Sequence, residues 1–222
     1  MCSKSLQQRF NSGEAIEFEK PTLVLASASP RRAKLLRDAK ITHVQVVSTV
    51  DDTELNIQFP HTGIGKAEAS KYADSMALAK LKPFIGKVRN GAVITADTII
   101  FCKGRILEKP LTKERCKEQH EFLSGKTNVN YTAYAVYYNG KIISKVMPTK
   151  VRVKKLPLQI IESICNEPEI LDCAGYRNQG QINPYLWFNK KHAANLTGLY
   201  VPFLLAMLKK IDFFADFKVI KP

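Results

Sequence analysis

Short apolar runs alternate with amphipathic stretches along most of this chain. Residues 22–26 form an apolar, β-leaning run, and Ser29 and Pro30 follow it as a helix N-cap and a first-turn proline. This pattern predicts a strand, a tight turn and a helix over residues 31–40, followed by a second strand over 43–48. Residues 64–82 then predict an alanine-rich helix, which Pro83 ends.

The middle of the chain predicts a central strand and a hairpin. Residues 92–102 are apolar except around Asp97 and lead into a Lys103-Gly104 turn, and Thr112 is suited to cap a helix that runs to residue 123. Two β-rich runs, 131–138 and 141–153, flank Asn139-Gly140, which is a strong hairpin signal. A short helix over 158–165, a Gly/Asn-rich loop over 172–184 and a C-terminal helix over 199–214 complete the pattern.

The order of these elements predicts the fold class. Strands alternate with helices and are followed by a hairpin, which is typical of an α/β or α+β fold around a mixed sheet. A chain of 222 residues with 45% hydrophobic content can bury one extended core, or two lobes that share one. We expect a polar N-terminal tail over residues 1–20 and a single domain over 21–222.

Composition bears on the compartment. The apolar runs stop at about ten residues, short of the ~20 that span a bilayer, and the first twenty residues contain no continuous apolar region of a secretory signal. We therefore expect a cytoplasmic protein with no membrane segment. The five cysteines, Cys2, Cys102, Cys116, Cys165 and Cys173, lack Cys-x-x-Cys spacing and are expected to be reduced thiols that form neither a disulfide framework nor a zinc site. The four histidines, His43, His61, His120 and His192, have no ligand-like spacing and are expected to be structural or exposed to solvent.

The net charge of +14 favours an anionic ligand, because such a surplus creates a positive field around any cleft that it lines. The basic residues are dispersed along the chain, without a compact block or an interleaved aromatic platform. We therefore do not expect nucleic acid to be the main ligand, and part of the charge is ordinary solvated lysine.

The turn after the first predicted strand combines hydroxyls, arginines and a helix start. In Ser27-Ala28-Ser29-Pro30-Arg31-Arg32, backbone N–H groups and two guanidiniums converge where the helix dipole is positive. Arginine binds phosphate bidentately, so this turn predicts a phosphate site. The alternative is an ordinary helix cap with exposed arginines.

Two groups of acids are candidates for chemistry. Asp97 interrupts an apolar run, where a buried carboxylate is costly unless it is paired or coordinates a metal. Asp51 and Asp52 follow the second predicted strand and could help to hold Mg²⁺ or Mn²⁺, which prefer oxygen ligands. The alternatives are a strand-end turn for Asp97 and exposed loop acids for the pair.

Five ordered motifs together resemble the Maf family of nucleotide pyrophosphatases. They are residues 25–32, Ala96-Asp97-Thr98, Glu108-Lys109-Pro110, Leu123-Ser124-Gly125, and Ala174-Gly175 leading to Gln179-Gly180. The resemblance implies a mixed-sheet fold related to the inosine triphosphate pyrophosphatases, a deep cleft between two lobes, a divalent cation (Mg²⁺ or Mn²⁺), and often a homodimer. Its implied activity is hydrolysis of a nucleoside triphosphate to the monophosphate and pyrophosphate.

The resemblance also implies residue roles. Asp97 is the general base or a metal-holding acid, Lys80 and Lys109 neutralise phosphate charge, and Asp51 or Asp52 occupies the family's acidic position, with Asp52 aligning better. Ser27, Ser29, Arg31 and Arg32 bind the phosphates.

The substrate branch is indicated by fewer positions. Thr98, Gln179 and the absence of Trp between Pro30 and Arg31 resemble the branch acting on dTTP and UTP, and the Gln179 amide offers a donor and an acceptor to the O4/N3 edge of a pyrimidine. Cys173-Ala174-Gly175 instead resembles the branch acting on 7-methyl-GTP.

Two departures from the family pattern bear on the pocket. Asn128 stands where the family usually has His, and the loop over residues 176–178 is one residue shorter. A slow enzyme, or a nucleotide- or RNA-binding protein that has lost catalysis, is therefore a rival hypothesis. An acyl hydrolase using Ser27 or Ser29 would lack a Gly-x-Ser-x-Gly elbow and a placed His.

Overall fold

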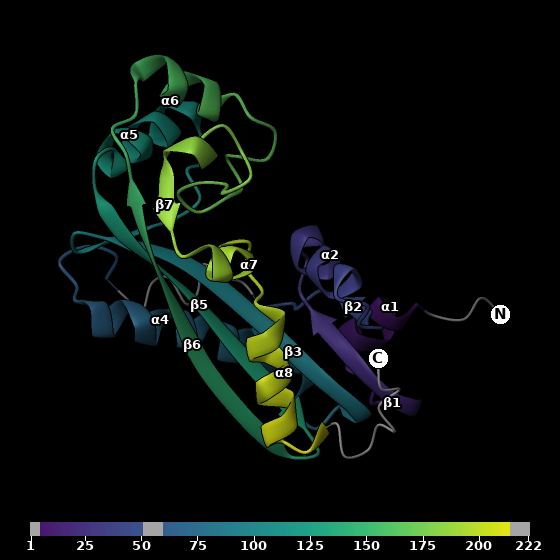
Figure 1. Ribbon diagram of the computed structural model, residues 1–222. Coiled ribbons are helices and arrows are strands. Elements are labelled where there is room, and N and C mark those ends of the chain that lie inside the picture. Colours follow the sequence, from purple (N-terminus) through teal and green to yellow (C-terminus); the bar gives the residue numbers. More distant parts are fainter. Residues whose placement is uncertain (1–4, 51–59, 214–222) are drawn as a thin grey trace.

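The computed structural model describes residues 5–50 and 60–213, and one mixed sheet organises them (Figure 1). The described strands form a seven-stranded sheet in the order β2-β1-β3-β5-β6-β7, with β4 paired to β3. Strand β1 pairs in parallel with β2 and with β3, whereas the pairs β3–β5, β5–β6 and β6–β7 are antiparallel. The predicted mixed-sheet fold class is thus confirmed.

The elements follow one another along the chain as follows: α1 (Leu6–Asn11), β1 (Ile16–Ala26), α2 (Pro30–Asp38), β2 (Val44–Val46), α4 (Lys66–Leu81), η1 (Lys82–Phe84), β3 (Val88–Cys102), β4 (Arg105–Leu107), α5 (Lys113–Leu123), β5 (Thr127–Tyr138), β6 (Lys141–Val153), α6 (Leu158–Cys165), η2 (Asn183–Tyr185), β7 (Leu186–Phe188), η3 (Lys190–His192), α7 (Ala193–Leu196) and α8 (Val201–Lys210).

The helices divide the hydrophobic core into three parts. Helix α4 packs on one face of β3 and β5, in a cluster that includes Tyr72 and Met76. Helices α2 and α8 cover the other face through Leu36 and Leu204, so α8 lies in front of the sheet in Figure 1 and α4 behind it. Helices α5 and α6 build a third cluster at the opposite end of the long strands. The sheet therefore carries α2 and α8 on one part of its surface and α5 and α6 at the other end of the long strands.

Local signals explain several of the elements. Ser29 caps α2 by accepting from the Arg32 N–H, with Pro30 in the first turn. Asn139 and Gly140 both have positive φ, as the two-residue hairpin turn between β5 and β6 requires. The predicted short helix over 158–165 is confirmed, whereas the C-terminal helix is described only from Val201 to Lys210.

The expected polar tail differs most from the structure. Ser5 caps helix α1 in a capping box, and β1 already begins at Ile16. Phe10 is 9% exposed and Ile16 only 1%, so both belong to the core beside α4. The scattered apolar residues of this segment were too few to show a periodic pattern, but two of them still join the core. The division into one domain over 21–222 stays a prediction.

The expectation of reduced cysteines is wrong for one pair. Cys116 of α5 and Cys165 of α6 form a disulfide, whereas Cys102 and Cys173 are free and buried. His120 lies one helical turn after Cys116, and in the described residues its ring and the two sulfurs form a compact Cys/His group. The spacing of the cysteines could not show this, because the contact depends on how α5 packs on α6.

None of the described helices combines enough length with enough apolar character to cross a bilayer.

Candidate active site

Part of one edge of β3 has no neighbouring strand among the described residues. Strand β1 pairs with β3 only as far as Leu25 opposite Ile94, and β4 begins to pair at Ile100. Between these points the described strands pair with β3 only through β5. A cleft of about 620 Å³ opens here, lined by the turn after β1, the middle of β3 and parts of the segment from 169 to 178. This opening exposes Asp97 and Thr98, which would otherwise be covered by a neighbouring strand.

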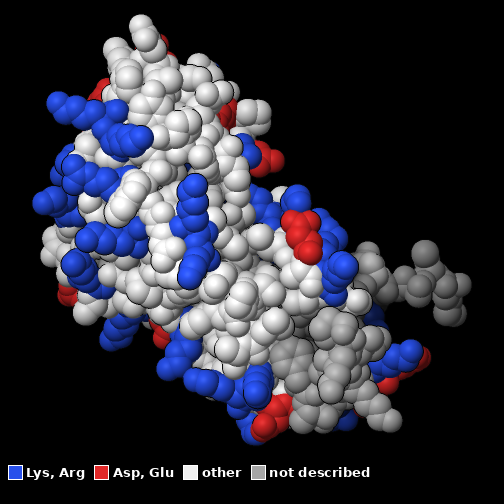
Figure 2. Space-filling model, in the orientation of Figure 1, with Lys and Arg blue, Asp and Glu red and all other residues white. Residues whose placement is uncertain are grey.

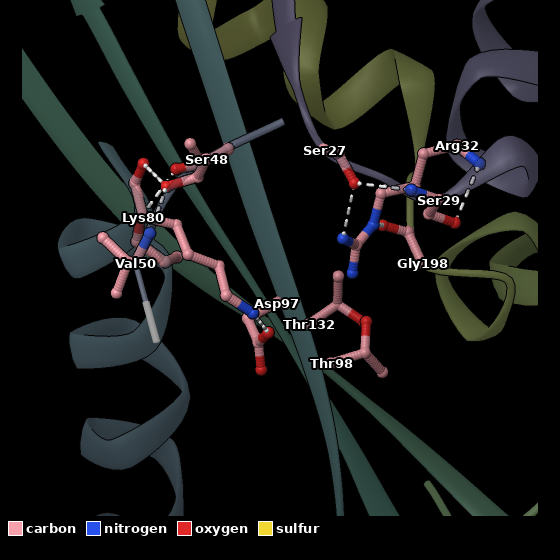
Figure 3. A network of polar contacts seen from close by, with 12 residues as sticks. Ser27, Ser29, Arg32, Ser48, Val50, Lys80, Asp97, Thr98, Thr132 and Gly198 are labelled. Carbon is pink, nitrogen blue, oxygen red and sulfur yellow. Dashed lines mark hydrogen bonds and ion pairs between the residues drawn. The ribbon is translucent and has the colours of Figure 1, made fainter. Parts of the chain in front are cut away.

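The turn after β1 holds Arg32 in a fixed orientation (Figure 3). Ser27 Oγ accepts from the Ser29 N–H at 3.2 Å and from Arg32 Nη1 at 3.1 Å. Arg32 Nε donates to the carbonyl of Gly198 at 3.0 Å, so the guanidinium bridges the turn and the link between α7 and α8. Ser29 is indeed a helix cap, but both arginines line the cleft rather than bulk solvent. The capping and phosphate-site interpretations of this turn are therefore compatible.

Arg31 reaches a different wall of the cleft. Its Nη1 lies 3.1 Å from the sulfur of Cys173, which belongs to the segment after α6. The Cys173 sulfur is only a weak hydrogen-bond acceptor. A phosphate oxygen would therefore replace it as the partner of the Arg31 guanidinium. The two adjacent arginines thus point to separate parts of the cleft, as binding to different phosphoryl groups would require.

Asp97 and Lys80 form an ion pair on the opposite side of the cleft. Lys80 Nζ, from the last turn of α4, lies 2.5 Å from Asp97 Oδ1, and the two side chains are 18% and 14% exposed. Asp97 lies inside β3 and not in a strand-end turn. Ser48 donates from its hydroxyl to the Lys80 carbonyl at 2.9 Å, which ties the end of β2 to this helix. The carboxylate is thus partly buried, paired and still accessible from the cleft (Figure 3).

Thr98 points to the other face of β3, because successive strand residues alternate. Its Oγ1 lies 3.1 Å from Thr132 Oγ1, which in turn donates to the Asn195 carbonyl at 3.1 Å. This chain of contacts fixes α7, the short helix that precedes Gly198. Thr98 also lies near Gly198, whose carbonyl positions Arg32, since a Cβ on Gly198 would lie 3.6 Å from Thr98 Oγ1.

Two expected site residues, Lys109 and Gln179, are exposed, and two others lie outside the described residues. Lys109 is exposed and lines the cleft. Gln179 is also exposed, but it is not among the lining residues, and its amide donates to Thr197 Oγ1 at 2.7 Å. Asp51 and Asp52 lie outside the described residues. Eight of the expected site residues thus lie around one cleft, whereas Gln179 lies beside it. The eight are Ser27, Ser29, Arg31, Arg32, Lys80, Asp97, Thr98 and Lys109.

A buried polar network surrounds Asn128, the residue that stands at the unusual position. Asn128 is 1% exposed, and its Oδ1 accepts from Asn130 at 2.9 Å and from the Tyr176 hydroxyl at 3.1 Å. Burial raises the pKa of Tyr176 above its ordinary value, so this phenol stays a neutral donor. Asn130 and Tyr176 line the cleft, whereas Asn128 supports them from behind. The Asn at a position where the family pattern leads us to expect His therefore changes a supporting contact and not Asp97 or the arginines.

Sequence reasoning missed several residues of this site. Asn130 and Tyr176 gave a weak signal as polar groups among apolar ones, but the Gly198 carbonyl gave none, since a backbone group carries no sequence pattern. Gly175, of the Ala174-Gly175 motif, has a φ of +64°, and a Cβ there would lie 2.6 Å from Ile100 Cδ1. This glycine thus lets the segment after α6 pass close to β3.

A family model and several known proteins match most of the chain. A model of the family described as Maf-like protein matches residues 22–211. A dTTP/UTP pyrophosphatase of Pyrococcus abyssi is 30% identical over 188 residues, which are 84% of this chain and 95% of the relative. One of Bacillus cereus is 32% identical over 192 residues, with 86% and 95% covered. One of Methanococcoides burtonii is 34% identical over 156 residues, with 69% and 75% covered.

Proposed function

The chain belongs to the Maf-like protein family, and from this premise we propose that it is a nucleoside triphosphate pyrophosphatase that hydrolyses dTTP and UTP to the monophosphate and pyrophosphate. The observation that carries the proposal is the cleft in which the Asp97–Lys80 pair faces the turn of Arg31 and Arg32. One wall offers a carboxylate to a reacting water, and the other offers cations to a polyphosphate. The names of the relatives support the substrate class.

The donor set of the cleft fits a divalent cation. Asp97 presents a carboxylate oxygen to the cleft, and Glu169 and Asp172 also line it. Mg²⁺ and Mn²⁺ prefer oxygen ligands and are commonly held by one or two carboxylates together with substrate phosphates. We propose Asp97 as a ligand, with Asp52 or Asp51 as a second one. When bound, the ion supplies positive charge to the phosphate oxygens.

The remaining chemistry is assigned to side chains of this cleft. Asp97 orients the attacking water and accepts its proton as the water approaches the α-phosphorus, and pyrophosphate leaves. Lys80, 2.5 Å from Asp97 Oδ1, holds the carboxylate in place. Arg31, Arg32 and Lys109 stabilise the charge that develops on the nonbridging and leaving oxygens, which is the dominant contribution in phosphoryl transfer.

Pyrophosphate release from a panel of nucleotides tests the proposal. The panel is dTTP, UTP, CTP, ATP, GTP and 7-methyl-GTP, each with Mg²⁺ or Mn²⁺. We expect metal-dependent turnover of dTTP and UTP and a loss of at least about 100-fold in Asp97→Asn, because a positioned general base contributes roughly 10²–10⁴-fold. Asp38→Asn, which makes the same change at a surface ion pair with Lys34, is the matched control and should stay active.

Each other outcome has a definite meaning. Turnover of 7-methyl-GTP alone would keep the reaction and reject the pyrimidine assignment, to which Gln179 outside the cleft lining gives no support. Full activity of Asp97→Asn with a preserved fold would reject the proposed base. Binding of nucleotides without any hydrolysis by the wild type would favour a catalytically inactive binding protein.

A homodimer and a cytoplasmic location are part of the same proposal. Sedimentation velocity of the purified chain tests the first, and fractionation of cells that express it tests the second.

A further inference from the structure

The chain's only tryptophan lies on the surface, away from the cleft. Trp187 is 73% exposed, although it belongs to the edge strand β7. Its neighbours Leu186 and Phe188 pack against the cluster beneath α5 and α6. Because side chains alternate along a strand, Trp187 must then point away from that cluster. An indole so exposed contributes little to stability, so its position calls for another explanation.

Strand pairing places Trp187 in a row with a cation. Arg152 of β6 lies directly opposite Trp187 on one side and opposite Thr127 of β5 on the other. A hollow of about 660 Å³ adjoins this row, and its lining includes Lys150 and His192. None of the residues that line the hollow lines the catalytic cleft. The two sites are therefore separate.

The surroundings of the hollow are basic. Lys150, Arg152 and Lys154 are exposed at alternate positions of β6 and the residue after it, and Lys190 and Lys191 are exposed in η3. Among the described residues none of these five makes an ion pair with an acid. Figure 2 shows Lys and Arg side chains crowded over the part of the molecule where β6 and β7 lie. Residues dispersed in sequence thus form the basic surface with an aromatic platform that sequence reasoning did not expect.

We propose that this surface, defined by Thr127, Lys150, Arg152, Trp187 and His192, binds single-stranded nucleic acid. A base stacks on the Trp187 indole, and the neighbouring phosphates contact Lys150 and Arg152. Exposed aromatic rings beside a cationic track are the features with which proteins bind single strands without reading sequence. Residues two apart along a strand are about 6.8 Å apart, which is close to the phosphate repeat of an extended single strand.

Other occupants fit the surface less well. A base-paired duplex hides its base faces, so Trp187 would have nothing to stack on. A second copy of the chain related by two-fold symmetry would bring one row of cations against an identical row, which is unfavourable. A single strand satisfies both the aromatic and the charged groups.

Because Trp187 is the only tryptophan, its fluorescence reports on this site alone. The full chain is titrated with dodecameric oligo(U) or oligo(dT), with a duplex of the same length, and with UMP. We expect the single strands to quench the emission with an affinity that falls as salt rises, and UMP and the duplex to bind at least tenfold more weakly. Quenching by UMP and the oligomer at the same concentration would overturn the proposal, because it would show a mononucleotide site.

Variants separate stacking from charge, with a labelled oligomer and fluorescence anisotropy as the readout. Trp187→Ala should weaken binding roughly 5- to 150-fold, since stacking on an aromatic contributes about 1–3 kcal/mol per base, and Trp187→Phe should recover most of the loss. The double variant Lys150→Ala/Arg152→Ala should lower the salt slope by about 1.4, because each phosphate contact contributes about 0.7 for a single strand.

The charge-matched control is Lys209→Ala/Lys210→Ala, which removes two exposed lysines at the far end of α8. If both double variants weaken oligomer binding equally, the effect comes from net charge alone, and the proposal is overturned. So would a Trp187-dependent dimer in sedimentation without oligomer binding. Pyrophosphate release from free nucleotides should be unchanged in all variants, so failure of this inference and failure of the proposed enzymatic function are distinguishable.

Discussion

Substitution of Gly198 by alanine tests whether the link between α7 and α8 positions Arg32. Gly198 has a φ of +106°, which an L-residue rarely adopts. A Cβ at this position would lie 3.1 Å from Arg32 Nε and 3.6 Å from Thr98 Oγ1. The Gly198 carbonyl accepts from Arg32 Nε at 3.0 Å, so any movement that relieves the backbone or the contact also moves the guanidinium.

The expected magnitude has two parts. Backbone strain at an unfavourable φ costs about 1–3 kcal/mol, so the free energy of unfolding of Gly198→Ala should fall by this amount. A displacement of about 1 Å in a positioning group can cost on the order of 100-fold in rate. We therefore expect kcat/KM for dTTP or UTP to fall roughly 10- to 100-fold, with most of the loss in kcat if Arg32 acts on the transition state.

Gly140→Ala is the control for strain without a contact at the site. Gly140 lies in the hairpin turn with a φ of +78°, and a Cβ there would have no heavy atom within 4 Å. Both variants are measured by urea unfolding and by pyrophosphate release. Gly140→Ala should lose stability and keep its activity. If Gly198→Ala also loses stability and keeps the wild-type kcat/KM, the assignment of Arg32 positioning to this link is wrong.

Three further predictions concern the buried groups. Tyr134→Phe should lower the free energy of unfolding by about 1–3 kcal/mol, because the Tyr134 hydroxyl donates to Asn195 Oδ1 at 2.6 Å and accepts from the Tyr200 N–H at 2.8 Å, and its loss leaves these partners unpaired; a loss below about 0.5 kcal/mol in urea unfolding would contradict this. Burial lowers the pKa of His120 below its ordinary value, so the unfolded chain binds the proton more readily than the folded one as pH falls below about 6.5. Between pH 7.5 and 5.5 the free energy of unfolding of the wild type should therefore fall by up to about 1 kcal/mol more than that of His120→Gln. An equal fall in both proteins would contradict this prediction. Reduction of the Cys116–Cys165 disulfide, which spans a sequence separation of 49, should lower stability by about 2–4 kcal/mol, and an unchanged thermal midpoint after reduction would show that it does not stabilise the fold.

Local signals in the sequence determined most of the elements. A cap at Ser29 with Pro30 behind it starts α2, and Asn139-Gly140 makes the hairpin, because these residues satisfy helix ends and positive φ by their own chemistry. A continuous apolar run predicted β3, and the acid inside it marked Asp97. The ordered motifs predicted the family, which the family model confirms.

Tertiary structure decided how these elements meet. Asp97 contacts Lys80 because α4 packs on β3, and Arg32 contacts the carbonyl of Gly198 across 166 positions of sequence. The cleft exists because β1 stops pairing with β3 at Ile94. No local sequence pattern encodes where a neighbouring strand stops. The same holds for the disulfide between α5 and α6 and for the basic surface around Trp187, since both join residues whose proximity depends on packing and strand pairing rather than on spacing along the chain.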